Sequence, residues 1–350
     1  WALAGFIVGF YENISTKILI MPFLIVSLEW VRSFGPLGFA WGNLAVTQMD
    51  MIHLLQFIEY GGTYIITLWI VSINLVIYYH FFKRSFSKQK LVMLVAVLLG
   101  INAMGLIKLN MKSDSNNNIE FDIAVIQPNL NPNEKWDRST RELTLNIMDS
   151  LHQLAIDLNP HIILFPETAL PAYLRLNNSI RKRLQSAVNE SNIPILIGTV
   201  DRRFDDLGKK LYFNSSMYLA PNEDYKMYDK IHLVPFAEYD LMPYILHPLG
   251  QLNLNIDRGI FMGGDKYVRF SYDEVSFSNL ICYESSLPRY ARRFTKDGAK
   301  FLMIQANDGW LGKSAGPYQH FELARLRAIE NRVPIVRSGN TGISGIIMRN

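Results

Sequence analysis

The feature that most constrains this chain is the run from Tyr64 to Phe82, which contains no Lys, Arg, Asp or Glu. A helix of about 20 apolar residues crosses the roughly 30 Å hydrocarbon core of a bilayer, so this run predicts a transmembrane helix. A second uncharged run extends from Leu91 to Ile107 and predicts a second span. Its flanking Lys90 and Lys108 have side chains long enough to reach the membrane interface.

A third span is predicted from Lys17 to Phe34, although Glu29 and Arg32 lie near its end. Residues 1–10, WALAGFIVGF, are typical of the end of a further span. Several hydrophobic segments in succession do not fit a cleaved signal peptide. We expect a membrane-embedded helical bundle of which this chain holds only a part.

The connection after the first run carries an excess of basic residues, namely Lys83, Arg84, Lys88 and Lys90. Cytoplasmic loops are enriched in Lys and Arg, which places this connection in the cytoplasm. The next span then crosses to the other side. Everything beyond about residue 112 is therefore expected outside the cytoplasmic membrane.

The composition indicates a chain with two halves. Of its 350 residues 49% are hydrophobic and 19% are charged, which is too many charges for a membrane bundle alone. The net charge of +4 comes without a basic cluster, so nucleic acid is not an expected partner. The polar run KSDSNNN at 112–118 is typical of a linker. We predict a helical domain at 1–112, a linker at 113–118 and a second domain at 119–350. The first residue, Trp1, and the strand-like end at Asn350 predict that elements are missing at both ends.

After the linker, short β-rich runs alternate with amphipathic segments, which indicates a layered α/β domain. The predicted strands are 121–129, 161–167, 193–200, 278–284, 300–308 and 334–340, and the predicted helices are 139–157, 179–190 and 317–331. Loops at the strand ends are the expected place for chemistry.

The single cysteine, Cys282, ends one of these apolar runs and can form no internal disulfide. A buried cysteine often serves only as a small apolar side chain. A catalytic thiol needs a base or a positive field. Glu167 follows Pro166 at the end of a strand, beside apolar neighbours that would raise its pKa toward that of a general base. Lys230 lies in an aromatic segment eight residues before Glu238, and a lysine in such a segment, taken alone, is usually a surface residue whose chain lies along apolar neighbours.

No histidine has the pattern of a base for Cys282. His232 and His320 are read as satisfied polar residues, and His161 and His247 as residues of proline-containing segments. Neither H-E-x-x-H nor C-x-x-C occurs, so no metal and no cofactor is expected.

Together, three segments resemble the motifs of the carbon-nitrogen hydrolase, or nitrilase, superfamily, whose members use a Glu-Lys-Cys triad in this order. FPETALP resembles the glutamate motif, YDKIHLVPFAEY the lysine motif with its second glutamate, and LICYES the cysteine motif. Ala237 stands where this family often has glycine. The resemblance extends from about Phe121 to Asn350. It implies an α-β-β-α sandwich with Glu167, Lys230 and Cys282 as the catalytic residues.

A nitrilase-like domain after several membrane spans resembles one branch, the apolipoprotein N-acyltransferases of the bacterial inner membrane. SLEWVRSFGPLGFAWGNLA (27–45) and IQPNLNPNEKWD (126–137) are similar to segments of that branch. The resemblance implies acyl transfer from a phospholipid, through a thioester on Cys282, to the N-terminal amine of a diacylated apolipoprotein. It implies no cofactor.

The resemblance also suggests supporting roles. Glu238 would orient Lys230, the backbone N–H of Tyr283 would join Lys230 at the oxyanion, and Glu284 would position the site. Three tryptophans are candidates for substrate contact, because tryptophan is enriched at membrane interfaces: Trp136, Trp310 and, more weakly, Trp41. Interface anchoring or core packing explains them equally well.

Two other functions stay open on the sequence. The first is a membrane-tethered amidase or nitrilase that uses the same residues with water as the second nucleophile. The second is a binding module in which Cys282 is inert, and the intact set of Glu167, Lys230 and Cys282 argues against it.

Overall fold

The computed structural model describes residues 2–82, 87–110, 120–132, 134–135, 137, 139–238 and 261–349. The chain divides into two compact units. The helical unit contains residues 1–118, 325–332 and 349–350, and the α/β unit contains residues 119–324 and 333–348. The predicted linker at 113–118 lies outside the described residues.

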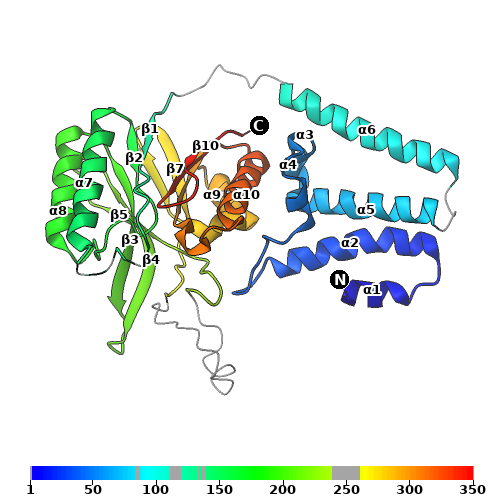
Figure 1. Ribbon diagram of the computed structural model, residues 1–350, viewed down its shortest axis with the longest axis horizontal. Helices are drawn as coiled ribbons and strands as arrows, with labels where there is room; N and C mark the ends of the chain where they lie inside the picture. The colour runs from blue at the N-terminus through cyan, green and yellow to red at the C-terminus, as the bar shows by residue number, and fades with distance from the viewer. Residues whose placement is uncertain are drawn as a thin grey trace. The chain divides into compact units, whose positions relative to one another are not determined.

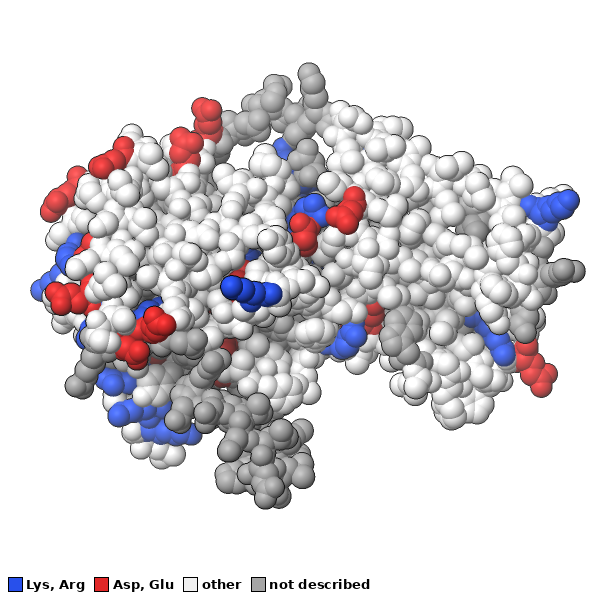
Figure 2. Space-filling model, viewed as in Figure 1, with Lys and Arg blue, Asp and Glu red and all other residues white. Residues whose placement is uncertain are grey.

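Three helices of the helical unit are long and apolar enough to cross a membrane (Figure 1). They are α2 (Ile14–Arg32), α5 (Thr63–Phe81) and α6 (Lys88–Asn110), and they correspond to the three predicted spans. Around them lie α1 (Ala2–Gly9), η1 (Leu44–Gln48), α3 (Ile52–Leu55) and α4 (Ile58–Gly61). On the face seen in Figure 2, the surface of the long helices is almost free of charged side chains away from their ends.

The connection between α2 and α5 is organised by a carboxylate. Glu29, in the last turns of α2, is 5% exposed. One oxygen accepts from the backbone N–H of Leu44 at 2.7 Å, and the other accepts from the Thr67 hydroxyl at 2.7 Å. A buried charge is tolerated when its hydrogen bonds are made, which explains how a glutamate is accommodated in an apolar helix.

Two five-stranded sheets form the α/β unit, in the orders β1-β2-β3-β4-β5 and β10-β9-β8-β7-β6. The first contains β1 (Ile123–Val125), β2 (Ile162–Leu164), β3 (Ile195–Phe204), β4 (Lys210–Leu219) and β5 (Lys226–Asp229). The second contains β6 (Arg269–Tyr272), β7 (Val275–Ile281), β8 (Phe301–Ala306), β9 (Ile335–Gly339) and β10 (Gly345–Ile347). In the first sheet β1, β2 and β3 are parallel, and β4 and β5 continue it in antiparallel pairs. The second sheet has a parallel centre of β7, β8 and β9 with an antiparallel pair at each edge.

Helices cover both sheets, giving four layers (Figure 1). The helices α7 (Arg141–Asp157) and α8 (Asn178–Ser191) pack on the first sheet, where Met148 and Leu184 join a core that includes Ile163 and Ile195. The helices α9 (Pro288–Lys296) and α10 (Gly316–Asn331) lie beside the second sheet. The predicted α-β-β-α sandwich, preceded by a helical membrane bundle, is confirmed.

The two sheets are also joined by polar groups in their shared interior. The Nε2 amide of Gln305, on β8, donates to the backbone oxygen of Phe165 at 2.8 Å. Asn279, on β7, donates to the Ser216 hydroxyl at 2.7 Å, and that hydroxyl also bonds to Gln305. This network fixes how the ends of β2 and β8 meet, and both strand ends lead into the site.

Three differences from the predicted elements have physical reasons. The strand predicted at 278–284 ends at Ile281, and residues Cys282–Ser286 form a 3-10 helix, η4. The prediction passed over β4 because Asn214, Ser215 and Ser216 interrupt its apolar pattern, yet all three are buried in the polar interior. The prediction also passed over β5, β6 and α9, which have too few apolar residues for a clear periodicity.

Candidate active site

Glu167 stands just beyond the end of β2 and is 6% exposed. The turn that carries it lies directly over β3, where a Cβ on Gly198 would come within 2.4 Å of the backbone oxygen of Pro166. Glycine is therefore required at 198. Asn214 donates to Glu167 Oε1 at 2.8 Å, whereas Oε2 is buried without a hydrogen-bond partner among the described residues. Burial raises the pKa of Glu167, and the charge of Lys230 opposes that rise.

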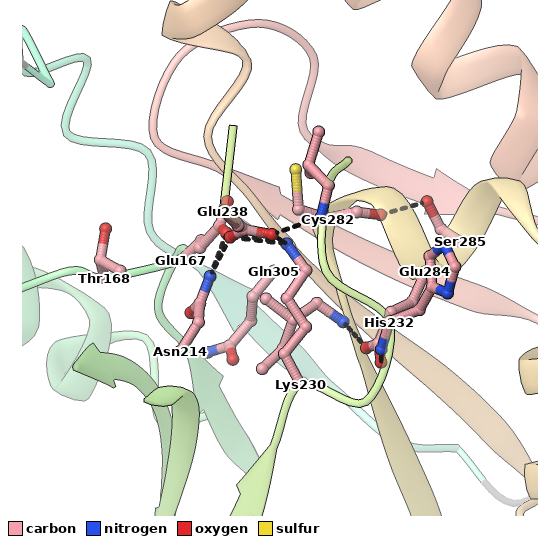
Figure 3. A network of polar contacts seen from close by, with 12 residues as sticks. Glu167, Thr168, Asn214, Lys230, His232, Glu238, Cys282, Glu284, Ser285 and Gln305 are labelled. Carbon is pink, nitrogen blue, oxygen red and sulfur yellow. Dashed lines mark hydrogen bonds and ion pairs between the residues drawn. The ribbon is translucent and has the colours of Figure 1, made fainter. Parts of the chain in front are cut away.

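Lys230 follows β5 and is completely buried. Its Nζ lies 2.8 Å from Glu238 Oε2 and 3.7 Å from Glu167 Oε1 (Figure 3). Burial would lower the pKa of Lys230, but the two carboxylates and Cys282 raise it above its usual value. The amine therefore stays charged and supplies a fixed positive field rather than a base.

Glu238 connects the lysine to the segment that carries it. Its Oε1 accepts from Asn214 at 2.9 Å, and its Oε2 accepts from the backbone N–H of Val234 at 2.8 Å. Asn214 thus donates to Glu167 and to Glu238. The predicted pairing of Glu238 with Lys230 is present in the structure, and Asn214 is a member of the network that sequence reasoning missed.

Cys282 begins η4 directly after β7 and is partly exposed. Figure 3 shows its sulfur beside the carboxylates of Glu167 and Glu238 and the amine of Lys230. Burial and the charge of Glu167 raise the pKa of the thiol, while Lys230 acts in the opposite direction. The arrangement holds a neutral thiol next to a carboxylate that can take its proton.

Glu284 joins the lysine and cysteine segments. Its carboxylate is fully buried and accepts from the Tyr228 hydroxyl at 2.8 Å and from the backbone N–H groups of Ile231 at 2.7 Å and Ile281 at 2.8 Å. Burial raises the pKa of Glu284 to about 6, and the hydrogen bonds limit the rise. A single side chain therefore fixes the distance between the residues flanking Lys230 and Cys282.

Each of the three motif segments contains a residue other than glycine with positive φ. The angle is 43° at Thr168, 64° at Phe236 and 50° at Cys282. Backbone strain of this kind costs of order 1–3 kcal/mol per residue and persists where the surroundings enforce it. The strained backbone is therefore a second indication, independent of the side chains, that these three segments are functional.

Buried polar groups around the triad were also missed by sequence reasoning. Lys135 is 3% exposed and donates to the backbone oxygen of the strained Thr168 at 2.6 Å, while burial lowers its pKa to about 8. His320, read from the sequence as a satisfied polar residue, lies 3.1 Å from the backbone oxygen of Cys282. No sequence motif signalled either one, because their partners are backbone atoms far away in the chain.

The tryptophans stay predictions. Trp310 lies on η5 (Asp308–Leu311) in the α/β unit and is 48% exposed. Trp41 is partly exposed and belongs to the helical unit. Trp136 lies outside the described residues.

This geometry suits nucleophilic acyl chemistry. A thiol, a carboxylate with a raised pKa and a permanently charged ammonium group converge at the ends of β2, β5 and β7. Among the described residues, no group of His, Cys, Asp and Glu side chains is placed to hold a metal ion.

Family models match both units. The carbon-nitrogen hydrolase model matches residues 122–349, and the model of the apolipoprotein N-acyltransferase N-terminal domain matches residues 1–76. The chain belongs to the apolipoprotein N-acyltransferase branch of the carbon-nitrogen hydrolase family. The predicted resemblance is thereby confirmed, and with it the assignment to a family of membrane enzymes.

Relatives agree over almost the whole chain. It is 32% identical to the apolipoprotein N-acyltransferase of Geobacter metallireducens, over 99% of this chain and 67% of that protein. It is 28% identical to the enzyme of the same name from Chlorobaculum tepidum, over 94% of this chain and 66% of that protein. The chain thus spans about two thirds of the length of these relatives. Among solved structures, an amidase of the nitrilase superfamily from Nesterenkonia matches with 16% identity and a TM-score of 0.47, covering 65% of this chain and 79% of the amidase.

Proposed function

We propose that this chain transfers a fatty acyl group from a phospholipid, through a thioester on Cys282, to the N-terminal amine of a diacylated apolipoprotein. The observation that carries the proposal is the convergence of Glu167, Lys230 and Cys282 in one buried network within a chain of this family. The three long apolar helices support it further, because both substrates are lipids.

In the first half-reaction, Glu167 takes the proton of the Cys282 thiol, using the carboxylate oxygen that has no partner among the described residues. The thiolate then forms a C–S bond with the carbonyl carbon of a phospholipid ester, and the π electrons move to the carbonyl oxygen. Lys230 and the backbone N–H of Tyr283 stabilise this oxyanion. The oxyanion collapses, the ester C–O bond breaks, and Glu167 returns its proton to the departing lysophospholipid.

In the second half-reaction, the amine of the diacylated N-terminal cysteine attacks the thioester carbon. Glu167 removes a proton from this amine, and the C–S bond breaks as the amide forms. Glu167 then passes this proton to the Cys282 thiolate, which restores the starting state. Lys230 stays charged throughout, which its two carboxylate neighbours favour. Water must be excluded from the thioester, or it would be hydrolysed.

The proposed location is the bacterial inner membrane, with the α/β unit on the extracytoplasmic side. The basic connection between the two spans at 64–82 and 91–107 supports this orientation.

The test uses full-length protein in detergent with a radiolabelled phospholipid and a synthetic diacylated lipopeptide. We expect N-acylated peptide and, when the acceptor is left out, a hydroxylamine-sensitive acyl group on Cys282. The Cys282→Ala variant should form neither. Release of free fatty acid with no acylated peptide would favour a tethered hydrolase instead.

Lys230→Met and Lys296→Met form a matched pair for the same assay. Lys230 is buried beside two carboxylates, whereas Lys296 is exposed on α9. Removing the ammonium group at 230 should lower the rate of acyl-enzyme formation by about 10²-fold or more, as for loss of one oxyanion donor. The change at 296 should leave the rate unaltered. Equal rates for the two variants would contradict the proposed role of Lys230.

A further inference from the structure

The peptide bond between Cys282 and Tyr283 is held by groups outside the triad. Its carbonyl oxygen accepts from the Ser285 hydroxyl at 2.7 Å and lies 3.1 Å from Nε2 of His320. A carbonyl oxygen can only accept, so this contact is a hydrogen bond in the tautomer that carries the proton on Nε2, in which Nδ1 accepts from the Arg337 guanidinium at 3.1 Å. His320 Nε2 also lies 3.0 Å from the Ser285 hydroxyl oxygen, which closes a small ring of contacts around one backbone carbonyl.

His320 is itself fixed by a buried ion pair. Its Nδ1 lies 2.7 Å from Oδ1 of Asp308, and Oδ2 of Asp308 accepts from Arg337 at 2.6 Å. Each of the three residues is at most 2% exposed. Burial would raise the pKa of Asp308, but His320 and Arg337 lower it below its usual value, so the carboxylate stays ionised. His320 comes from α10, Asp308 from η5 and Arg337 from β9, so residues of two other elements hold the imidazole.

The peptide group is planar and trans, so its N–H points opposite to its C=O. The carbonyl of Cys282 is turned toward Ser285 and His320. The N–H of Tyr283 therefore points the other way. Rotation of this peptide, which changes ψ of Cys282 and φ of Tyr283, would break both contacts of the carbonyl oxygen. A rotated peptide would present an oxygen, rather than an N–H, to the substrate oxyanion.

We propose that His320, braced by Asp308 and Arg337, is a positioning residue that holds the Cys282–Tyr283 peptide so that its N–H points at the forming oxyanion. This inference rests on the proposed role of Cys282 as an acyl-accepting nucleophile, but it holds for any acyl donor. His320 touches neither the sulfur nor the substrate in this role. Its contribution appears only in steps that place negative charge on a carbonyl oxygen.

Two reactions of Cys282 separate this role from a general structural one. Acylation by p-nitrophenyl butyrate forms a C–S bond, moves the carbonyl π electrons to oxygen and then expels p-nitrophenolate. Alkylation by iodoacetamide forms a C–S bond while the C–I bond breaks, and no oxyanion arises. A misdirected N–H therefore slows only the first reaction, whereas a displaced sulfur or base slows both.

We expect His320→Leu to lower the acylation rate by about 10- to 100-fold, while the alkylation rate changes less than threefold. His320→Gln places an amide N–H near the position of Nε2, and it should recover at least a third of the wild-type acylation rate. Ser285→Ala removes one of the two contacts of the same carbonyl and should cost about tenfold in acylation alone.

An equal loss in both reactions would overturn the inference, as would unchanged acylation in His320→Leu. If His320→Leu does not fold, the Ser285→Ala and His320→Gln variants decide between the same outcomes. The proposed function fails separately, namely if the wild-type protein is acylated by the butyrate ester at Cys282 but not by phospholipid.

Discussion

Each unit contains a deeply buried glutamate, and the two are held in different ways. In the helical unit, both oxygens of Glu29 accept hydrogen bonds, one from a backbone N–H and one from a hydroxyl. In the α/β unit, Glu167 uses Oε1 toward Asn214, while Oε2 is buried with no hydrogen-bond partner among the described residues. A carboxylate with both oxygens engaged stabilises structure. One with an oxygen left available in a buried site can accept a proton.

The two units also differ in which side chains they expose and which they bury. The long helices of the helical unit leave apolar side chains such as Leu19, Val92 and Leu99 about two-thirds exposed, as expected for a surface that meets lipid. The α/β unit buries its apolar strands and also buries Glu167, Lys230 and Glu284. Buried charges cost free energy unless they are paired, so their concentration at three strand ends indicates that they are retained for chemistry.

The largest expected effect is a loss of activity when Glu167 is replaced. Glu167→Gln keeps the size of the side chain and an oxygen for Asn214, but it removes the base. We expect the acylation rate of Cys282 to fall by about 10²- to 10⁴-fold, with the thermal unfolding midpoint little changed. Glu142→Gln, on the exposed face of α7, is the control and should keep full activity. A Glu167→Gln variant with more than a tenth of the wild-type rate would rule out Glu167 as the base.

Replacement of Glu29 should instead loosen the local structure of the helical unit and leave the Glu167 segment unchanged. Glu29→Ala removes the acceptor of Leu44 and Thr67, and two hydrogen bonds to a charged group are worth about 3 kcal/mol together. We expect faster amide hydrogen exchange in residues 44–48 by mass spectrometry, because Leu44 begins η1 and donates directly to Glu29. Exchange in residues 162–170 should not change. Glu12→Ala, at an exposed position, is the control. Unaltered exchange at 44–48 would show that Glu29 does not hold this connection.

Much of this contrast could be predicted from the sequence, because it follows from local patterns. Uncharged runs give the membrane helices to within a few residues, and apolar runs give the central strands. The three motif segments lead to Glu167, Lys230 and Cys282. The rest depends on contacts between distant parts of the chain. Lys135 bonds to the backbone of Thr168, and His320 to that of Cys282. The spacing of apolar residues along the sequence does not predict such contacts, and no sequence pattern predicts the positive φ at Cys282 either.

Glu284 extends the comparison, because its carboxylate is buried and hydrogen-bonded like that of Glu29 but lies in the active site. We expect it to make the unfolding free energy depend on pH. Its folded-state pKa of about 6 stands above the ordinary 4.5, so the folded state binds the proton more tightly than the unfolded state does. Stability from this group is therefore present below pH 4.5 and is lost as pH rises to 6. The difference corresponds to about 2 kcal/mol.

The matched variant for this prediction is Glu284→Gln, which cannot titrate. As the pH rises from about 3.5 to about 7, the unfolding free energy of the wild-type protein should fall by about 2 kcal/mol relative to that of the variant. Parallel pH profiles would contradict the prediction, because they would mean that Glu284 has the same pKa in the folded and unfolded states.

The smallest expected effect concerns Trp310, which lies on the same 3-10 helix as Asp308 but turns a 48% exposed side chain outward. If its ring contacts the lipid substrate, Trp310→Ala loses binding that is equal in the ground and transition states. KM for the phospholipid then rises about fivefold, equivalent to about 1 kcal/mol, while kcat is unchanged. Trp310→Phe should restore most of the affinity, since it keeps an aromatic surface. If the ring instead only packs against its neighbours, the unfolding midpoint falls and KM does not move. Because Asp308 braces His320, a fall in kcat would show that Trp310 acts through η4, which carries Cys282, rather than on the lipid.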